Sequence, residues 1–322
     1  MREFDLIERI QALLGAPSES VLIGPGDDAA VVRLEGRTAV SVDAAVEGVH
    51  FDLRFMTPWA VGRRAAAAAL SDLAAMGATP RFALLDFGLR PGMEPAVIMK
   101  LVEGFVEECG RHGAEIVGGN ITSCQAIFFS STVIGAIEGD PLVRSGARPG
   151  DRILVSGELG GSSLAVEIMM REACLQSADT EEICKTYLIP NPRIGLGLAL
   201  RGIASAAIDI SDGLGQDLGH VAKASGVGAL IHLSKVPRPA GFGRIAPVFG
   251  DPMHFMAAGG EDYELLVTVP PERLAEAFAA AEKVKVRLTE IGEIVDRDQG
   301  VTFFDLAGQA WKPDTLGWDH LR

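Results

Sequence analysis

The chain has 322 residues, of which 48% are hydrophobic and 22% are charged, as in an ordinary globular protein with room for two domains. Its formal net charge of −14 argues against a nucleic-acid-binding protein, which needs a basic surface. No run of about 20 apolar residues is present, so no segment is predicted to cross a membrane. The charge does not exclude an anionic substrate, because bound divalent cations reverse the local field.

The first half of the chain alternates between helical and strand patterns. Residues 1–15 are expected to form a short amphipathic helix, since charges run through them and the apolar core of a signal peptide is missing. Proline in the first turn and glycine at the end mark a second helix over 58–76, whose alanine run indicates burial. The remaining elements of this half are strands at 38–45, 81–89, 114–118 and 126–137 and a helix at 94–112.

A stretch rich in proline and glycine at 139–150 is the best candidate for a domain boundary. We therefore expect an N-terminal domain over 1–140 and a C-terminal domain over 141–322. The second half is expected to hold a strand from 152, a helix from about 162, a strand at 206–210, a helix to about 224, and strands near 228–233, 262–269, 287–295 and 301–305. Together these elements predict an α+β fold with mixed sheets.

Acidic residues recur where apolar segments meet glycine or serine. They are Asp27, Asp28, Asp43, Asp72, Asp209, Asp212, Glu261 and Asp262. Carboxylates gathered in one pocket would repel each other and resist ionisation. Mg²⁺ ions held by a few carboxylates and by substrate phosphates would remove that repulsion. The pattern therefore predicts a site for several Mg²⁺ ions and a phosphorylated substrate.

These acidic positions also have structural explanations. Residues 24–29 fit the dinucleotide fingerprint G-x-G-x-x-A, but two carboxylates in the loop would repel a pyrophosphate, and an Asp-rich turn is the simpler alternative. Asp72 lies near the negative end of its helix, which is unfavourable by up to about 1 kcal/mol unless a cation holds it. Ser211 or Asp212 would serve as a helix cap, but a cap does not explain Asp209 in an apolar strand.

Other features are weaker signals. His50 beside Phe51 is more typical of a structural histidine, and Arg144 is either a linker charge or a phosphate ligand. The glycine-rich turn at 157–163 lacks Gly-Lys-Ser/Thr, so metal and backbone would have to hold a nucleotide. The cysteines lack zinc spacing and indicate free thiols in a reducing cytoplasm. They are Cys109, Cys124, Cys174 and Cys184.

An ordered set of segments resembles the thiamine-monophosphate kinase family, of the superfamily that includes aminoimidazole ribonucleotide synthetase. The segments are GPGDDAAVV at 24–32, SVDAAVEGVHF at 41–51, LSDLAAMGATP at 70–80, VGGN at 117–120, RSGARPGD at 144–151, IDISDGLGQDLGHVAKASGVGA at 208–229, GGEDYEL at 259–265 and GWDHL at 317–321. The resemblance implies the two-domain fold of that superfamily. It also implies a homodimer formed by pairing of N-terminal sheets, with ATP in a cleft between the domains.

The resemblance further implies a role for each matching residue. The Mg²⁺ ligands would be Asp27, Ser41, the backbone of Val42, Asp43, Asp72, Asn120, Asp209 and Asp212. The ATP contacts would be Gly119, Asn120, Arg144 and Ser211, and Arg144 would also stabilise charge. The thiamine phosphate contacts would be His50, Glu261 and Trp318. The implied activity is direct in-line transfer of phosphate from ATP to thiamine phosphate, with no general base because the acceptor oxygen is already ionised.

One departure from the family pattern matters for the metal site. Gly-Gly-Asp-Thr is replaced by Gly-Gly-Asn-Ile at 118–121, so Asn120 brings an oxygen without a charge, and a higher Mg²⁺ requirement is expected. A selenophosphate synthetase would need a reactive cysteine near the N-terminus, and a hydrogenase-maturation relative a cysteine-containing tail; both are disfavoured. The alternative outside the enzymes is a regulatory protein that binds ATP without catalysis. Asn120 is the only feature of the sequence that favours it.

Overall fold

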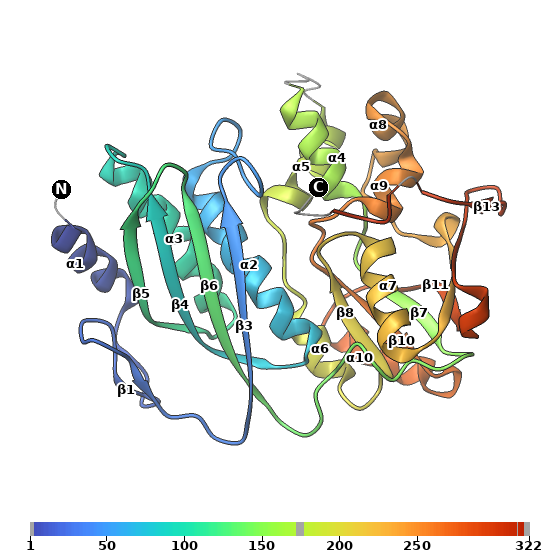
Figure 1. Cartoon of the computed structure of the whole chain (residues 1–322), viewed down its shortest axis with the longest axis horizontal. Coiled ribbons are helices and arrows are strands. Elements are labelled where there is room, and N and C mark those ends of the chain that lie inside the picture. Colours follow the sequence, from blue (N-terminus) through green and yellow to red (C-terminus); the bar gives the residue numbers. More distant parts are fainter. Residues whose placement is uncertain (1–2, 172–176, 314, 319–322) are drawn as a thin grey trace. The chain divides into compact units, whose positions relative to one another are not determined.

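The computed structural model describes residues 3–171, 177–313 and 315–318. The chain folds into two compact units (Figure 1). Unit 1 consists of Met1–Leu73 and Ala78–Gly139, and unit 2 consists of Ala74–Gly77 and Asp140–Arg322. Both units combine helices with β-sheets, which confirms the predicted α+β class.

Unit 1 is built on a four-stranded sheet with the strand order β3-β6-β4-β5. The β4 and β5 strands are parallel, and the other pairs are antiparallel. The elements of this unit are α1 (Glu3–Leu14), β1 (Val21–Ile23), β2 (Val31–Val32), β3 (Arg37–Val46), α2 (Pro58–Ala75), β4 (Thr79–Leu89), α3 (Pro95–Arg111), β5 (Glu115–Ser123) and β6 (Phe128–Ile137). Every element expected in this half is present. The short strands β1 and β2 were not predicted, because their sequences show no alternation of apolar and polar residues. The β5 strand extends five residues beyond its predicted end.

Helices α2 and α3 cover one face of this sheet (Figure 1). From the sheet, Phe129 stacks on Phe105 of α3 with ring centroids 6.2 Å apart. The two helices approach each other at Gly62 and Gly104. A Cβ at Gly62 would lie 1.7 Å from the Leu101 carbonyl oxygen, and a Cβ at Gly104 would lie 2.0 Å from the Trp59 carbonyl oxygen. The helices therefore meet backbone to backbone, and the buried α2 is held rigidly under the sheet.

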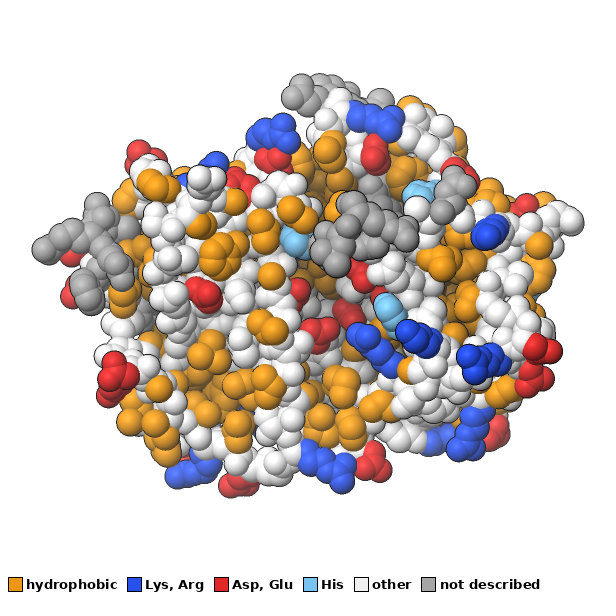
Figure 2. All heavy atoms as spheres, in the orientation of Figure 1, with side chains coloured by type: hydrophobic (Ala, Val, Ile, Leu, Met, Phe, Trp, Pro, Cys, Tyr) orange, Lys and Arg blue, Asp and Glu red, His pale blue; other side chains and the backbone are white. Residues whose placement is uncertain are grey.

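The other face of the sheet, which we call the open face, is only partly covered. Val21 and Val32 of the β1–β2 ribbon pack near one end of it, against Leu84 and Ile134. On the edge strand β3, Val40 is 64% exposed, and Val42, two residues on, is equally open. Figure 2 shows hydrophobic side chains spread over this part of the molecule, with few charges among them.

Unit 2 is built on a seven-stranded sheet with the strand order β13-β12-β9-β11-β7-β10-β8. Its strands are β7 (Arg152–Ser156), β8 (Ala206–Ile210), β9 (Gly228–His232), β10 (Glu264–Val269), β11 (Leu288–Val295), β12 (Val301–Phe304) and β13 (Ala310–Trp311). Its α-helices are α4 (Gly161–Met170), α5 (Ala178–Leu188), α6 (Ile194–Leu200), α7 (Leu214–Ser225), α8 (Phe242–Phe249), α9 (Pro252–Ala258) and α10 (Leu274–Lys283). The predicted strands and the helices α4 and α7 are confirmed, whereas α5, α6, α8, α9, α10 and β13 were not anticipated.

Cysteine chemistry and membrane association can be stated for the described part of the chain. Cys109, Cys124 and Cys184 are free thiols, and Cys174 lies outside the described residues. Within the ranges given above, the helices are too short or too polar to cross a membrane.

Candidate functional site

In unit 1, a strand and a helix bring three of the predicted metal ligands together. Ser41 and Asp43 lie two residues apart on β3 and therefore share one side of it, roughly 7 Å from each other along the strand. Asp72 lies on α2, on the helix-covered face of the sheet, and its Oδ2 accepts a hydrogen bond of 2.5 Å from the Ser41 hydroxyl. The acid near the negative end of α2 is thus held by β3, and its oxygens lie beside those of Ser41.

The remaining predicted residues on the β3 side of unit 1 are placed separately. Asp27 lies in an exposed turn, where its Oδ1 accepts the N–H of Asp28 at 2.8 Å. The Val42 side chain is 65% exposed, so only its backbone remains for the predicted metal contact. The Nδ1 atom of His50 accepts the Val46 N–H at 3.1 Å, which places the proton of the neutral ring on Nε2. His50 is thus tied to its own loop.

Asn120 lies at the opposite edge of the sheet from Asp43. The ladder partners run Asp43, Ser131, Leu85 and Gly119 across the four strands, which is three strand spacings or roughly 14 Å. Asn120 is the next residue of β5, so its side chain lies on the open face, whereas Asp43 lies on the helix-covered face. Within one chain, these two residues cannot bind the same ion.

In unit 2, the loop that leads from β8 into α7 carries the predicted acidic residues. Asp209 is only 4% exposed and pairs with Leu265 across the ladder to β10. The helix does not begin as expected, because its N-cap is Gly213, with φ of 124°, and no side chain caps it from there. The prediction of a cap at Ser211 or Asp212 is therefore wrong.

A buried carboxylate one turn into α7 binds the loop that precedes the helix. The Oδ2 atom of Asp217 accepts the backbone N–H groups of Ser211, Asp212 and Gly213, each at 3.1 Å. Burial and then the negative charges of Asp209 and Asp212 raise the pKa of Asp217 to about 7. Asp217 is therefore the residue that fixes the shape of the loop.

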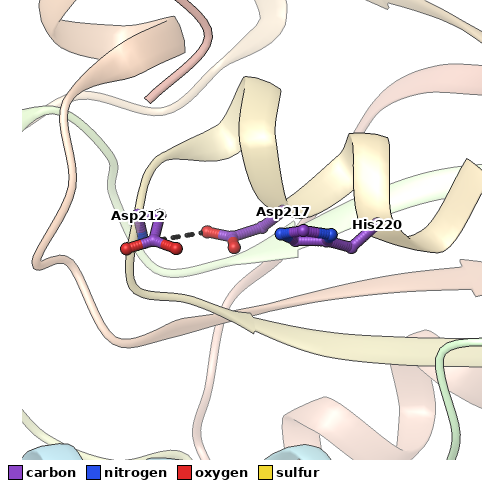
Figure 3. Close-up of side chains that lie close together, drawn as sticks. All are labelled: Asp212, Asp217 and His220. Atoms are coloured by element: carbon purple, nitrogen blue, oxygen red, sulfur yellow. Dashed lines mark hydrogen bonds between the residues drawn. The ribbon is translucent and has the colours of Figure 1, made fainter. Parts of the chain in front are cut away.

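Asp212, Asp217 and His220 form a cluster that could hold a cation (Figure 3). One ligand atom from each lies within 4.8 Å of the others. Asp212 comes from the loop, while Asp217 and His220 project from successive turns of α7. Because Asp217 Oδ2 already accepts three N–H groups, Asp212 is the residue of this cluster best placed to offer oxygen to an ion.

Three further contacts fix the position of Asp212 and its neighbours. The Gln216 amide donates to Asp212 Oδ2 at 2.8 Å, and the N–H of Trp318 donates to the Asp212 carbonyl at 3.1 Å. The N–H of Glu261 donates to the Ser211 carbonyl at 2.7 Å. The loop before α7 is thus bonded to two segments that are distant in the sequence. Both segments carry predicted thiamine phosphate contacts, Glu261 and the 55% exposed Trp318.

Glu261 has an unusual backbone conformation. Its φ is 74° and that of Tyr263 is 51°, a region that residues other than glycine seldom occupy. The Tyr263 hydroxyl donates to Glu261 Oε2 at 3.0 Å and so aims the carboxylate. Strained backbone of this kind collects at functional sites, where the surrounding structure holds it in place.

The last predicted residue of unit 2, Arg144, is exposed. The carbonyl of its neighbour Val143 accepts the Ala207 N–H at 2.9 Å, and its own carbonyl accepts the Ser225 hydroxyl at 3.2 Å. Arg144 therefore lies beside β8, the strand that carries Asp209.

Sequence reasoning gave no role to Asp217, Gln216 or Tyr263, and it did not single out Asp86. Asp217 had a usable signal, since it is an acid among apolar positions in the first turn of a predicted helix. Asp262 was noted only as part of the acidic pattern. Its carboxylate accepts the N–H groups of Gly160 and Ser162 at the start of α4, and burial raises its pKa to about 7.

A pocket of about 340 Å³ lies elsewhere in unit 2. Its lining includes Arg193, Lys285, Arg287 and Glu264, and it also includes Asp262, the last residue of the acidic pattern seen in the sequence. Arg193 forms a close ion pair with Glu264, which also accepts a hydrogen bond from Ser156. The pocket is therefore organised by paired charges.

Comparisons with known proteins cover both units. The AIR synthase related protein models match residues 26–137 for the N-terminal domain and 148–305 for the C-terminal domain. A thiamine-monophosphate kinase of Mycobacterium tuberculosis (strain CDC 1551 / Oshkosh) is 41% identical over 271 residues, which cover 82% of this chain and 79% of the relative. The crystal structure of thiamine-monophosphate kinase from Stenotrophomonas maltophilia K279a is 34% identical, has a TM-score of 0.84, and is matched over 97% of this chain and 98% of that one. The structure of AaThiL complexed with AMPPCP and TMP is 32% identical, with a TM-score of 0.79 and 99% of both chains covered.

Proposed function

The chain belongs to the thiamine-monophosphate kinase branch of the AIR synthase related family, and on that premise we propose that it phosphorylates thiamine phosphate. The products are thiamine diphosphate and ADP, and ATP is the phosphate donor. The observation that carries this proposal is the 41% identity to a kinase of that name over most of both chains. The acidic sets of both units lie in segments that resemble those of the same family.

The oxygen donors of both units suit Mg²⁺, which prefers carboxylate, hydroxyl and carbonyl oxygens. In unit 1, Ser41, Asp43 and Asp72 would hold it, and the hydrogen bond between Ser41 and Asp72 keeps two of these groups together. In unit 2, Asp209 and Asp212 would hold it, with Asp212 fixed by Gln216. Asp27 would add a further ligand. Asn120 would belong to a separate metal site, because it lies on the open face. Bound Mg²⁺ would neutralise the charge on the phosphate groups of both substrates.

The chain's own groups would bind and orient the two phosphorylated substrates. The acceptor is a phosphate oxygen that is already ionised, so no residue is needed to remove a proton. What remains is to hold two anions in line and to neutralise their charge. Gly119, Ser211 and Arg144 would contact ATP, with the Arg144 guanidinium adding fixed positive charge. His50, Glu261 and Trp318 would contact thiamine phosphate, and Tyr263 aims the Glu261 carboxylate.

The open face of unit 1 supports a homodimer as part of the proposal. Val40 and Val42 are both more than 60% exposed on an edge strand that has one neighbour in its sheet. Exposed apolar edge strands are seldom left uncovered in native proteins. We expect a second copy of the chain to cover this face. Size-exclusion chromatography with light scattering should show a dimer, and Val42→Glu should shift it toward monomer.

The deciding experiment measures ADP release from Mg·ATP with thiamine phosphate, with thiamine, or with no acceptor. ADP formed only with thiamine phosphate, and matched by thiamine diphosphate, would establish the activity. ATP binding without ADP release would instead favour the alternative that Asn120 suggests, a regulatory protein that binds ATP without catalysis. The reaction is proposed to take place in the cytoplasm, where ATP is available and free thiols persist.

A further inference from the structure

An aspartate on the neighbouring strand lies against Asn120. Asp86 on β4 and Asn120 on β5 are partners in the parallel ladder, so both side chains lie on the open face. The Asn120 amide Nδ2 donates to Asp86 Oδ1 at 3.1 Å. This bond uses the nitrogen of the amide and one of the two carboxylate oxygens. The Asn120 carbonyl oxygen and the second Asp86 oxygen therefore remain as potential ligand atoms.

The pair carries one negative charge that no basic side chain neutralises. Across the described ranges, no lysine, arginine or histidine forms an ion pair with Asp86. Unit 1 exposes few charges on this face, and the proposed dimer would cover it. A carboxylate taken out of water is costly unless a cation or several hydrogen bonds compensate its charge. The single bond from Asn120 gives only part of that compensation.

We propose that Asp86 supplies the carboxylate charge that position 120 lacks, so that Asp86 and Asn120 together hold one divalent cation. This inference rests on the proposed function, in which position 120 is a metal contact. If the Asn120 carbonyl oxygen binds the ion, the Asp86 carboxylate lies roughly 4–6 Å from it or closer, where opposite charges still interact strongly. Mg²⁺ in proteins usually keeps several waters, so Asp86 acts on the ion directly or through one of them. The higher Mg²⁺ requirement expected from Asn120 alone is therefore offset.

The test moves the charge from one strand to the other. Asp86→Asn removes the charge but keeps an oxygen that can accept the Asn120 amide bond. The double variant Asp86→Asn with Asn120→Asp returns the charge on β5. Glu115→Gln is the matched control, because Glu115 begins the same strand β5 and its Oε2 accepts the Ser18 N–H, away from position 120.

Binding is measured directly with Mn²⁺ as the probe, by electron paramagnetic resonance of the protein with a non-hydrolysable ATP analogue. We expect Asp86→Asn to weaken one Mn²⁺ site roughly tenfold or more, and the double variant to restore it. Glu115→Gln should bind Mn²⁺ as the wild type does. The Mg²⁺ concentration for half-maximal ADP release should follow the same order.

Equal Mn²⁺ affinity in wild type, Asp86→Asn and Glu115→Gln would overturn the inference and leave Asp86 as a strand partner only. The inference would also be overturned if the double variant did not recover Mn²⁺ affinity, because a carboxylate at position 120 would then not replace the one at position 86. These outcomes are distinct from failure of the proposed function. If the wild type forms no thiamine diphosphate while Asp86→Asn still loses Mn²⁺, the cation site stands and the kinase proposal fails.

Discussion

The two units hold their acidic residues by different means. In unit 1, Ser41 and Asp43 lie on a regular strand, and Asp72 lies on a buried helix and accepts a hydrogen bond from Ser41. In unit 2, Asp212 sits in a loop whose backbone is bonded to Asp217 and Trp318. The first arrangement depends mainly on regular secondary structure, and the second on hydrogen bonds to the backbone of an irregular loop. We therefore expect the acidic set of unit 1 to tolerate changes in nearby residues, and the set of unit 2 to depend on Asp217 and Trp318.

The largest expected effect comes from the rigid set of unit 1. Asp72→Asn should lower kcat roughly 10³-fold, because a metal ligand contributes several kcal/mol of charge stabilisation in the transition state. Its unfolding free energy should stay constant or rise by a few tenths of a kcal/mol, since an acid is removed from the negative end of α2. Steady-state kinetics and urea unfolding measure the two quantities. Asp52→Asn, in the same unit and paired with Arg54, is the control, and a near-normal rate for Asp72→Asn would remove Asp72 from the metal site.

A change in the loop of unit 2 should lower stability and activity together. Asp217→Ala leaves three backbone N–H groups without their acceptor and should cost about 3 kcal/mol of unfolding free energy. It should also raise the Mg²⁺ concentration needed for activity, whereas Asp217→Asn, which keeps an acceptor oxygen, should retain most of both properties. Urea unfolding and Mg²⁺ titrations provide the two measurements.

Asp151→Ala separates loss of stability from loss of site geometry. Asp151 is also buried and accepts hydrogen bonds from the Arg148 N–H and the Ser205 hydroxyl, none of them a predicted site residue. This control should unfold more easily with no change in Mg²⁺ dependence. If Asp217→Ala behaves in the same way, Asp217 supports the fold and does not position Asp212.

A smaller effect on activity is expected from the tyrosine hydroxyl that orients the Glu261 carboxylate. Tyr263→Phe removes the hydrogen bond to Glu261 and should raise the KM for thiamine phosphate about fivefold, since such a bond contributes about 1 kcal/mol. The KM for ATP should stay constant. Tyr187→Phe tests for general loss of a buried tyrosine hydroxyl, as Tyr187 is the only other tyrosine of the chain. An equal change in both KM values would contradict the assignment of Glu261 to the acceptor.

The stability of the protein should also depend on pH. Burial raises the pKa of Asp262 from 3.8 to about 7, so the folded state binds more protons than the unfolded state between these values. Stability must then fall as the pH rises through this range. Unfolding free energies measured from pH 4 to pH 7 should decline more steeply for the wild type than for Asp262→Asn. Parallel curves for the two proteins would show that the two backbone hydrogen bonds keep Asp262 ionised.

The part of the fold that could be predicted from the sequence is the part with strong periodicity. The strands at 37–46 and 206–210 and the helix at 58–75 have clear patterns and clear ends. The short helices α8 and α9 follow one another within residues 242–258, a range too short for a pattern to separate them from a loop. Likewise, Ser41 and Asp43 could be placed on one face by counting residues. The link from Trp318 to Asp212 could not be predicted, because it joins residues more than 100 positions apart.

The glycine contact between α2 and α3 also restricts how the protein can diverge. At Gly62 and Gly104 each helix rests on the other's main chain, so no side chain is available there to be exchanged for a larger or smaller one. A mutation at either position cannot be compensated by a matching change at the other, because both would need more space. Lineages of this protein can vary the sheet and the loops around the helix pair. We expect these two glycines to be inherited together, and with them the depth at which Asp72 is presented.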